Sequence, residues 1–123
     1  MNPEAGDRVI HTQNEVVTEA DLLSCAKITD EISKRPLGIA YVIALRTIID
    51  SGALPPGAMM LGHRVTWHEA PSAATFRTEL RILAADPPRR RYQKVTIGYR
   101  TLEASTGRLV LEQEQEVLWP VVA

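Results

Sequence analysis

Residues 37–52 carry apolar side chains at the spacing of a helix. The helical positions are Leu37, Tyr41, Ala44, Leu45, Ile48 and Ile49, and Ile39, Val42 and Ile43 add apolar residues on the other sides. Gly52 marks the end of the segment, because glycine commonly stands just past the last turn of a helix. A helix that is apolar almost all round is one that other elements wrap. We therefore expect this helix at the centre of the fold.

The hydrophobic pattern changes from helical spacing to strict alternation after the Pro-Pro-Gly break at residues 55–57. Alternation of apolar and polar side chains predicts strands with one wet face over residues 60–69 and 74–84. Two longer strands are predicted over residues 92–104 and 108–121, joined by a short Ser-Thr-Gly hairpin loop. The second half of the chain thus predicts an antiparallel sheet.

Weaker signals precede the apolar helix. Residues 6–13 alternate weakly and predict a first, short strand. Thr18, with an acidic residue three positions on, gives a capping-box-like start to a helix over residues 18–28. One long helix cannot pack on both sides of so few strands, so a curved antiparallel sheet wrapped around a long central helix is the economical solution. This α+β architecture is the hotdog fold.

Composition limits the class of protein. With 123 residues and 13.6 kDa, the chain fits one domain over residues 1–123. Its 14 Lys and Arg against 15 Asp and Glu give no global field that would attract a nucleic acid or an anionic membrane. No signal peptide is visible and the longest apolar run, residues 37–45, is too short to span a bilayer, so we expect a cytoplasmic protein. The single cysteine, Cys25, excludes an internal disulfide and is interpreted as a small buried residue rather than a reactive thiol.

Three stretches resemble one family. GDRVIHTQNEVVTEADLLSCAKITDE (residues 6–31) resembles the opening of MaoC-like (R)-specific enoyl-CoA hydratase/dehydratase domains. PLGIAYVIALRTIIDSG (residues 36–52) resembles their central helix, and HRVTWHEAPSAATFRTELRIL (residues 63–83) the strand, proline turn and strand that follow. The resemblance implies binding of an acyl thioester, on coenzyme A or an acyl carrier protein, in a tunnel at a homodimer or heterodimer interface. It implies no cofactor beyond the coenzyme A or phosphopantetheine of the substrate.

The loop before the central helix departs from the family pattern. The family's loop carries an aspartate and a histidine for reversible hydration of a 2-enoyl thioester, a reaction that needs one group to activate water and another to handle the proton. Here the loop is shortened and no histidine stands between His11 and His63. Asp30 or Glu31 falls near the family's aspartate and is the candidate catalytic group, against the alternative of a solvated charge at a helix end.

The start of the central helix supplies the candidate substrate-binding residues. The amides of Gly38, Ile39 and Ala40 form a positive helix end that could hold a thioester carbonyl, unless the loop or water satisfies them. Tyr41 is either a hydroxyl donor to the thioester or a core residue, and Arg35 either contacts coenzyme A phosphates or is a solvated loop charge.

Two other groups of residues have both a functional and a purely structural interpretation. His63 and His68 lie on opposite faces of one predicted strand without a third ligand nearby, so we expect no metal site; His63 is interpreted as a satisfied inward residue or part of the tunnel wall. Residues 89–91, three arginines, either grip phosphates or an acidic carrier helix or form a solvated hairpin tip.

Three functions remain open at this point. The first is a hydratase or dehydratase that uses Asp30 or Glu31. The second is a non-catalytic hotdog subunit that pairs with a catalytic partner and helps to form its acyl tunnel. The third is a hotdog acyl-CoA thioesterase, which requires a carboxylate that points into the tunnel. Fold alone does not separate them; the lost histidine counts against the first as a homomer.

Overall fold

The computed structural model describes residues 6, 8–25, 29–30, 35–69 and 72–121, and its regular elements are as follows. The strands of the main sheet are β1 (Val9–Val17), β4 (Met59–Trp67), β5 (Ala74–Ala85), β6 (Tyr92–Glu103) and β7 (Leu109–Pro120). The helices are α1 (Glu19–Cys25) and α2 (Leu37–Ser51), and two short strands, β2 (Thr29–Asp30) and β3 (Arg35–Pro36), pair with each other just before α2.

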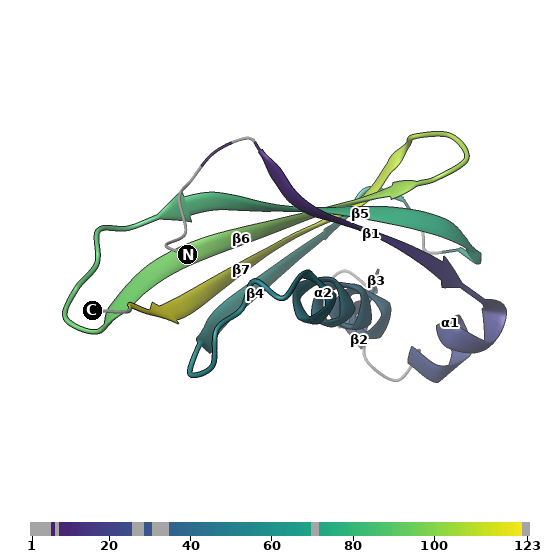
Figure 1. The fold of residues 1–123 in the computed structure, drawn as a ribbon. Coiled ribbons are helices and arrows are strands. Elements are labelled where there is room, and N and C mark those ends of the chain that lie inside the picture. The colour runs from purple at the N-terminus through teal and green to yellow at the C-terminus, as the bar shows by residue number, and fades with distance from the viewer. Residues whose placement is uncertain (1–5, 7, 26–28, 31–34, 70–71, 122–123) are drawn as a thin grey trace.

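The main sheet is antiparallel throughout, in the order β1-β5-β6-β7-β4. It curves over α2, which lies against one of its faces, while α1 lies beyond the end of β1 (Figure 1). The four strands predicted in the second half of the chain are confirmed, and so is the α+β fold with an antiparallel sheet. β1 is longer than predicted and continues to Val17.

The capping box predicted at Thr18 is present. The Thr18 amide donates to the Asp21 carboxylate at 2.9 Å, and the Asp21 amide donates to the Thr18 hydroxyl at 3.2 Å. Two backbone amides at the start of α1 are thereby satisfied. The helix spans seven residues, and residues 26–28 of the predicted helix lie outside the described part of the chain, like the side chain of Cys25.

The core lies between α2 and the sheet. Near the end of α2, Ala44 and Ile48 pack into one buried cluster of sheet residues, which includes Leu80, Ile97 and Trp119. Nearer its start, Ile39, Ala40 and Ile43 pack into a second, with Val17, Phe76, Val110 and Leu111. The helix is therefore anchored by its sheet-facing positions along its whole length.

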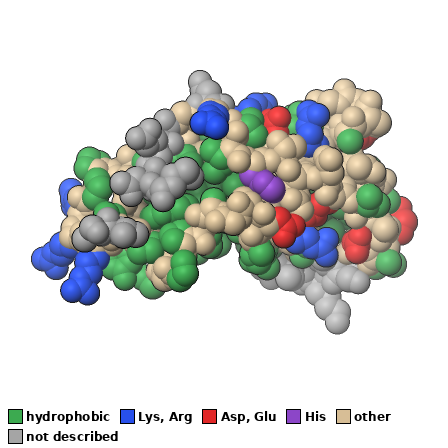
Figure 2. All heavy atoms as spheres, in the orientation of Figure 1, with side chains coloured by type: hydrophobic (Ala, Val, Ile, Leu, Met, Phe, Trp, Pro, Cys, Tyr) green, Lys and Arg blue, Asp and Glu red, His purple; other side chains and the backbone are tan. Residues whose placement is uncertain are grey.

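The opposite side of α2 is bare, which departs from the prediction of a long helix that is wrapped. α2 has 15 residues, and Tyr41, Leu45 and Ile49 are 39%, 56% and 62% exposed. Met59, Met60 and Leu61 at the start of β4 are also more than half exposed. In Figure 2, hydrophobic side chains gather on the side of the molecule where α2 and β4 lie in Figure 1. We call Tyr41, Leu45, Ile49 and Met60 the bare apolar face; Met60 pairs with the buried Val117 at the free edge of β4, whereas Met59 pairs with Leu118 and points to the other side of the sheet.

None of the described helices is long and apolar enough to cross a membrane.

Candidate functional site

The predicted substrate-binding residues lie at the start of α2. Gly38, Ile39 and Ala40 form its first turn and are buried against the sheet. Tyr41 lies outside the core on the bare apolar face. The interpretation of Tyr41 as a core residue is therefore wrong, and its hydroxyl remains available to a ligand or a partner chain.

The predicted catalytic carboxylates fall where less is described. Asp30 and Arg35 are direct backbone partners in the β2–β3 pair, just before α2. Their side chains lie outside the described residues, and so does Glu31 altogether. The catalytic role of Asp30 or Glu31 and the binding role of Arg35 therefore stay predictions.

A histidine from β4 lies against the first turns of α2. The ring of His63 stands 4.8 Å from that of Tyr41, measured between centroids, and the two planes are tilted by 46°. His63 Nε2 donates to Gln113 Oε1 at 2.7 Å, which leaves Nδ1 as the acceptor of the ring. Burial lowers the pKa of His63 below its ordinary 6.5, although the hydrogen bond to Gln113 opposes this. Because its pKa lies below 6.5, His63 is a neutral imidazole at neutral pH. Its half-buried ring lies beside the ring of Tyr41.

A groove on the other side of α2 contains a carboxylate that the sequence analysis missed. The groove has a volume of about 220 Å³ and lies between β1, α1 and α2. Its lining residues are Glu15, Val16, Val17, Asp21, Ile39, Val42, Ile43 and Arg46. Glu15 is only 8% exposed, and its Oε2 lies 3.8 Å from Arg46 Nη1. Most of the wall is aliphatic, so the groove offers one buried carboxylate in apolar surroundings.

A second, apolar cavity lies next to the groove, beneath the first turns of α2. Val17, Ile39 and Ile43 line both, and Trp67 and Phe76 are among the residues that line the second alone. This second cavity is nearly filled by its own side chains, with a volume of about 10 Å³. The two cavities are therefore neighbours that share a wall.

Some buried polar atoms near α2 have no hydrogen-bond partner. Among the described residues, three buried side-chain atoms have no hydrogen-bond partner: Glu15 Oε1, Trp67 Nε1 and Gln113 Nε2. Glu15 lines the groove, Trp67 lines the apolar cavity, and Gln113 holds His63 beside Tyr41. Buried polar groups are nearly always satisfied, so each of these three atoms is a candidate contact for water or a polar ligand.

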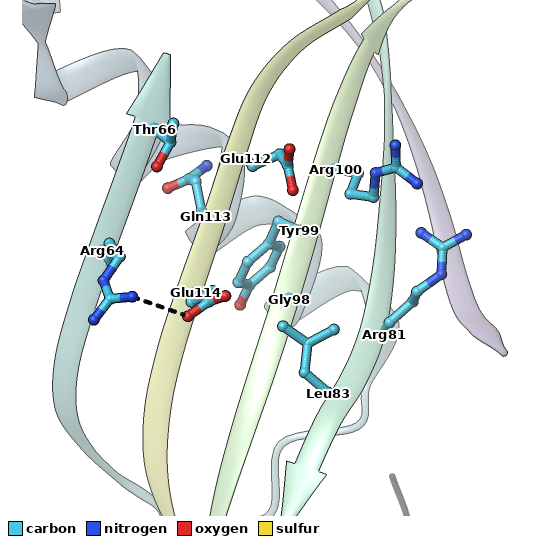
Figure 3. A pocket seen from close by; sticks show the side chains of 10 residues that line it. All are labelled: Arg64, Thr66, Arg81, Leu83, Gly98, Tyr99, Arg100, Glu112, Gln113 and Glu114. Carbon is cyan, nitrogen blue, oxygen red and sulfur yellow. Dashed lines mark ion pairs between the residues drawn. The ribbon is translucent and has the colours of Figure 1, made fainter. Parts of the chain in front are cut away.

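A depression on the outer face of the sheet is a different kind of site. It measures about 220 Å³ and centres on Gly98, with Arg64, Arg81 and Arg100 around it and Glu112 and Glu114 on β7 (Figure 3). α2 lies behind the sheet in this view. Arg64 and Glu114 pair at 3.8 Å across its floor, and Glu112 instead meets His68 at 2.9 Å. Mixed, mostly paired charges on an exposed face fit a solvated surface.

The other residues weighed in the sequence lie apart from the start of α2. The loop that carries the three arginines at 89–91 joins β5 to β6 at the end of the sheet opposite α1 (Figure 1), and all three are exposed. Within the described part of the chain, no group of three or more His, Cys, Asp and Glu residues could hold a metal ion.

Glu15 was missed because the first strand was predicted to stop at residue 13. The full strand alternates, and the less exposed positions are Val9, His11, Gln13, Glu15 and Val17. Three polar side chains in succession on the inner face of an edge strand are the signal that could have pointed to this groove.

Comparison with solved structures gives the fold. A MaoC-like dehydratase from Rhodospirillum rubrum superposes with a TM-score of 0.70 at 19% sequence identity, over 98% of this chain and 95% of that one. The C-terminally truncated HadBC (3R-hydroxyacyl-ACP dehydratase) complex from Mycobacterium tuberculosis matches with a TM-score of 0.57 at 18% identity, over 68% of this chain and 61% of that one. A protein from Archaeoglobus fulgidus matches with a TM-score of 0.56 at 13% identity, over 94% and 81% of the two chains.

These neighbours confirm the predicted resemblance at the level of the fold: the chain has the hotdog fold of MaoC-like dehydratases. No protein-family model matches the sequence, and neither does any curated protein.

Proposed function

We propose that this chain is an acyl-thioester-binding hotdog protein of the MaoC-like hydratase/dehydratase type. The thioester, carried on coenzyme A or an acyl carrier protein, binds beside the first turns of α2, and a second hotdog chain covers the bare apolar face. The two dehydratases that share the fold support the reaction class. The proposal needs no cofactor beyond the coenzyme A or phosphopantetheine of the substrate.

The observation that carries the proposal is the set of buried polar atoms near α2 that have no hydrogen-bond partner. Glu15 Oε1, Trp67 Nε1 and Gln113 Nε2 supply one acceptor and two donors. A 3-hydroxyacyl thioester presents a hydroxyl and a carbonyl on an otherwise apolar chain, which matches polar atoms in aliphatic walls. The positive end of the α2 dipole adds a favourable field for a carbonyl oxygen that gains negative charge.

The partner in this proposal is a second hotdog chain. β4 is an edge strand of the main sheet, so its outward backbone groups have no partner strand among the described residues. The bare apolar face continues from this edge onto α2. The HadBC structure, a complex, supports the idea that such chains associate with one another. The partner is either a second copy or a related chain that keeps the loop aspartate and histidine.

Hydrolysis is the second candidate, because the groove contains the kind of carboxylate that it requires. Glu15 faces a cavity beside α2 and could activate water against the thioester carbonyl rather than against the double bond. The two reactions leave different products: hydration keeps the thioester, whereas hydrolysis releases a thiol.

The test is an assay of the purified chain, alone and mixed with a hotdog chain that keeps the loop aspartate and histidine. Crotonyl-CoA and longer 2-enoyl-CoA substrates are followed by the loss of conjugated thioester absorbance, and free thiol is titrated in parallel. We expect hydration, with the mixture more active than the isolated chain. Thiol release without hydration would favour the thioesterase.

A groove-filling variant ties the activity to this site. Val42→Trp places a large ring in the groove from its half-buried α2 position, and we expect acyl-CoA affinity to fall at least about tenfold. Leu83→Trp makes a matched change on the outer face of the sheet, where the side chain is exposed, and should leave affinity unchanged.

The proposal fails if the wild-type chain, alone and in the mixture, neither binds nor converts any acyl thioester.

A further inference from the structure

Glu15 stands in surroundings that a structural carboxylate would avoid. Its side chain is 7% exposed, and its Oε1 is buried with no hydrogen-bond partner. The guanidinium of Arg46 comes no closer than 3.8 Å to Oε2 and is itself 61% exposed, so it is a weak counter-charge. A buried charge held without a hydrogen bond destabilises a fold, and a functional role would explain why one is present.

Burial acts against the ionised form of Glu15, and the charges around it act in both directions. Burial raises the pKa of Glu15 above its ordinary 4.5; Arg46 lowers it, and Asp50 on α2 and Asp21 on α1 raise it again. On β5 the directly opposite residue is the uncharged Phe76. A carboxylate whose pKa lies closer to neutrality exchanges protons more readily at physiological pH.

The other polar side chains on the inner face of β1 are already engaged. His11 Nε2 donates to Gln13 Oε1 at 2.9 Å, and Gln13 Nε2 donates to Asp50 Oδ2 at 2.6 Å. This chain of hydrogen bonds fixes Asp50 away from the groove, whose lining includes Glu15 and Arg46 but not Asp50. Among the described side chains of this seam between β1 and α2, Glu15 alone has a buried oxygen without a hydrogen-bond partner.

We propose that Glu15 is the proton-transfer residue of this groove and acts on an acyl thioester whose reacting carbons lie against Ile39 and Ile43. The inference rests on the proposed function and names its catalytic group. It places that group on β1, not on the shortened loop. The Asp30 or Glu31 of the sequence prediction is then not required for the chemistry.

The step balances with water as the only co-reactant. The ionised carboxylate of Glu15 takes a proton from water while the water oxygen forms a bond to C3 of the 2-enoyl thioester. The C2–C3 π electrons move to the thioester oxygen as an enolate, near the positive end of α2. The protonated Glu15 then gives its proton to C2, the enolate collapses, and the carboxylate is restored. Dehydration is the same path in reverse.

The experiment compares Glu15→Gln with the wild-type chain in enoyl-CoA hydration. The chain is assayed alone or mixed with the second hotdog chain, whichever gives the higher turnover. Glutamine keeps the shape and removes the exchangeable proton, so we expect kcat to fall at least about 100-fold while KM changes less than about threefold. Glu114→Gln is the matched control: it makes the same substitution and also removes a 3.8 Å ion pair with an arginine, but on the outer face of the sheet. It should keep wild-type turnover.

The pH profile gives a readout that a structural role would not move. We expect kcat/KM for hydration to fall on the acidic side with an apparent pKa above 4.5, and Arg46→Gln to shift this limb to higher pH because Arg46 lowers the pKa of Glu15. Glu15→Asp keeps a carboxylate and should retain part of the activity, which gives a second variant if Glu15→Gln folds poorly.

The outcomes separate the two proposals. If Glu15→Gln keeps turnover within about threefold of the wild type, or if Arg46→Gln leaves the acidic limb in place, the assignment of Glu15 is wrong while the acyl-thioester function stands. If the wild-type chain hydrates no enoyl thioester in any condition, both proposals fail.

Discussion

Replacing Leu45 by glutamate tests whether the bare apolar face is an interface. Leu45 is 56% exposed at the middle of the face, between Tyr41 and Ile49 one turn away on either side. The substitution should leave the folded single chain nearly unchanged, because more than half of the side chain is already in water. It should weaken association with a second hotdog chain, because the carboxylate would be buried against apolar side chains.

The size of the effect follows from the exposed fraction. Full burial of a leucine side chain is worth about 2 kcal/mol, so covering the 56% that remains exposed contributes about 1 kcal/mol per chain. In a homodimer both copies change, which removes about 2 kcal/mol and raises the dissociation constant about 30-fold. The cost of burying an unpaired carboxylate adds to this, so we expect a total rise above about 100-fold.

The measurement is sedimentation velocity or light scattering across a concentration series, with thermal unfolding of each variant as a check on folding. Leu83→Glu is the matched control, since Leu83 is 44% exposed on the outer face of the sheet. It should associate like the wild type. Equal association of Leu45→Glu and the wild type, or dissociation by Leu83→Glu instead, would show that the interface lies elsewhere.

Three predictions concern the stability of the single chain. Gly98→Ala should lower the free energy of unfolding by about 1 kcal/mol, because a Cβ there would lie 2.7–2.9 Å from three side-chain atoms of Leu83. Leu83→Ala should remove this penalty. If urea denaturation shows that the free-energy losses of the two substitutions simply add in the double variant, the explanation is wrong. Tyr99→Phe should cost about 1–3 kcal/mol, because it removes the buried 2.5 Å hydrogen bond from the hydroxyl to Gln115 Oε1; a loss below about 0.5 kcal/mol would count against it. As pH rises from 4.5 through the raised pKa of Glu15, the free energy of unfolding of the wild type should fall relative to that of Glu15→Gln. The loss should be about 1.4 kcal/mol for each tenfold difference in proton affinity between the folded and unfolded chains. The sign follows because the folded state binds this proton more tightly, and a rise in relative stability over that range would refute it.

The strands could be predicted from the alternation of apolar and polar residues, because one face of each strand is buried and the other is exposed. In β5, Phe76, Leu80 and Ile82 are buried while Arg77 is exposed, as the pattern predicted. β7 follows the same rule with Gln113 and Gln115 among its buried positions, which a hydrophobicity pattern would place in water. These glutamines are inward because they meet His63 and Tyr99, partners from other strands that the sequence of β7 alone does not reveal.

The helical pattern correctly identified the apolar residues of α2, but it did not show what covers them. An apolar side chain indicates that something covers it, but not that the cover belongs to the same chain. Ile39 and Ile43 are covered by the sheet, whereas Leu45 and Ile49 are not. Their exposure is the physical reason why the predicted wrapping is only partial in the single chain, and it is what a partner would complete.

The carboxylate proposed as catalytic could not be found by searching near the family's loop. The resemblance directed attention to Asp30 and Glu31, because the aspartate of the family stands there. Glu15 lies fifteen residues earlier than Asp30 in the chain and reaches α2 only because β1 pairs with β5 at the edge of the curved sheet. Such a contact depends on tertiary register, and no local motif encodes it.

The proposals assign separate roles to the two exposed sides of α2, and this separation can be tested. Tyr41, Leu45 and Ile49 form one side, while Val42 and Arg46 line the groove on the other, so no residue of α2 belongs to both. If the groove binds the acyl thioester within one chain, a dissociated Leu45→Glu variant should keep its affinity for an acyl-CoA within about threefold of the wild type, measured by calorimetry. Loss of binding in a folded, monomeric variant would mean that the partner completes the substrate site, and that Glu15 in its own groove is not sufficient to form it.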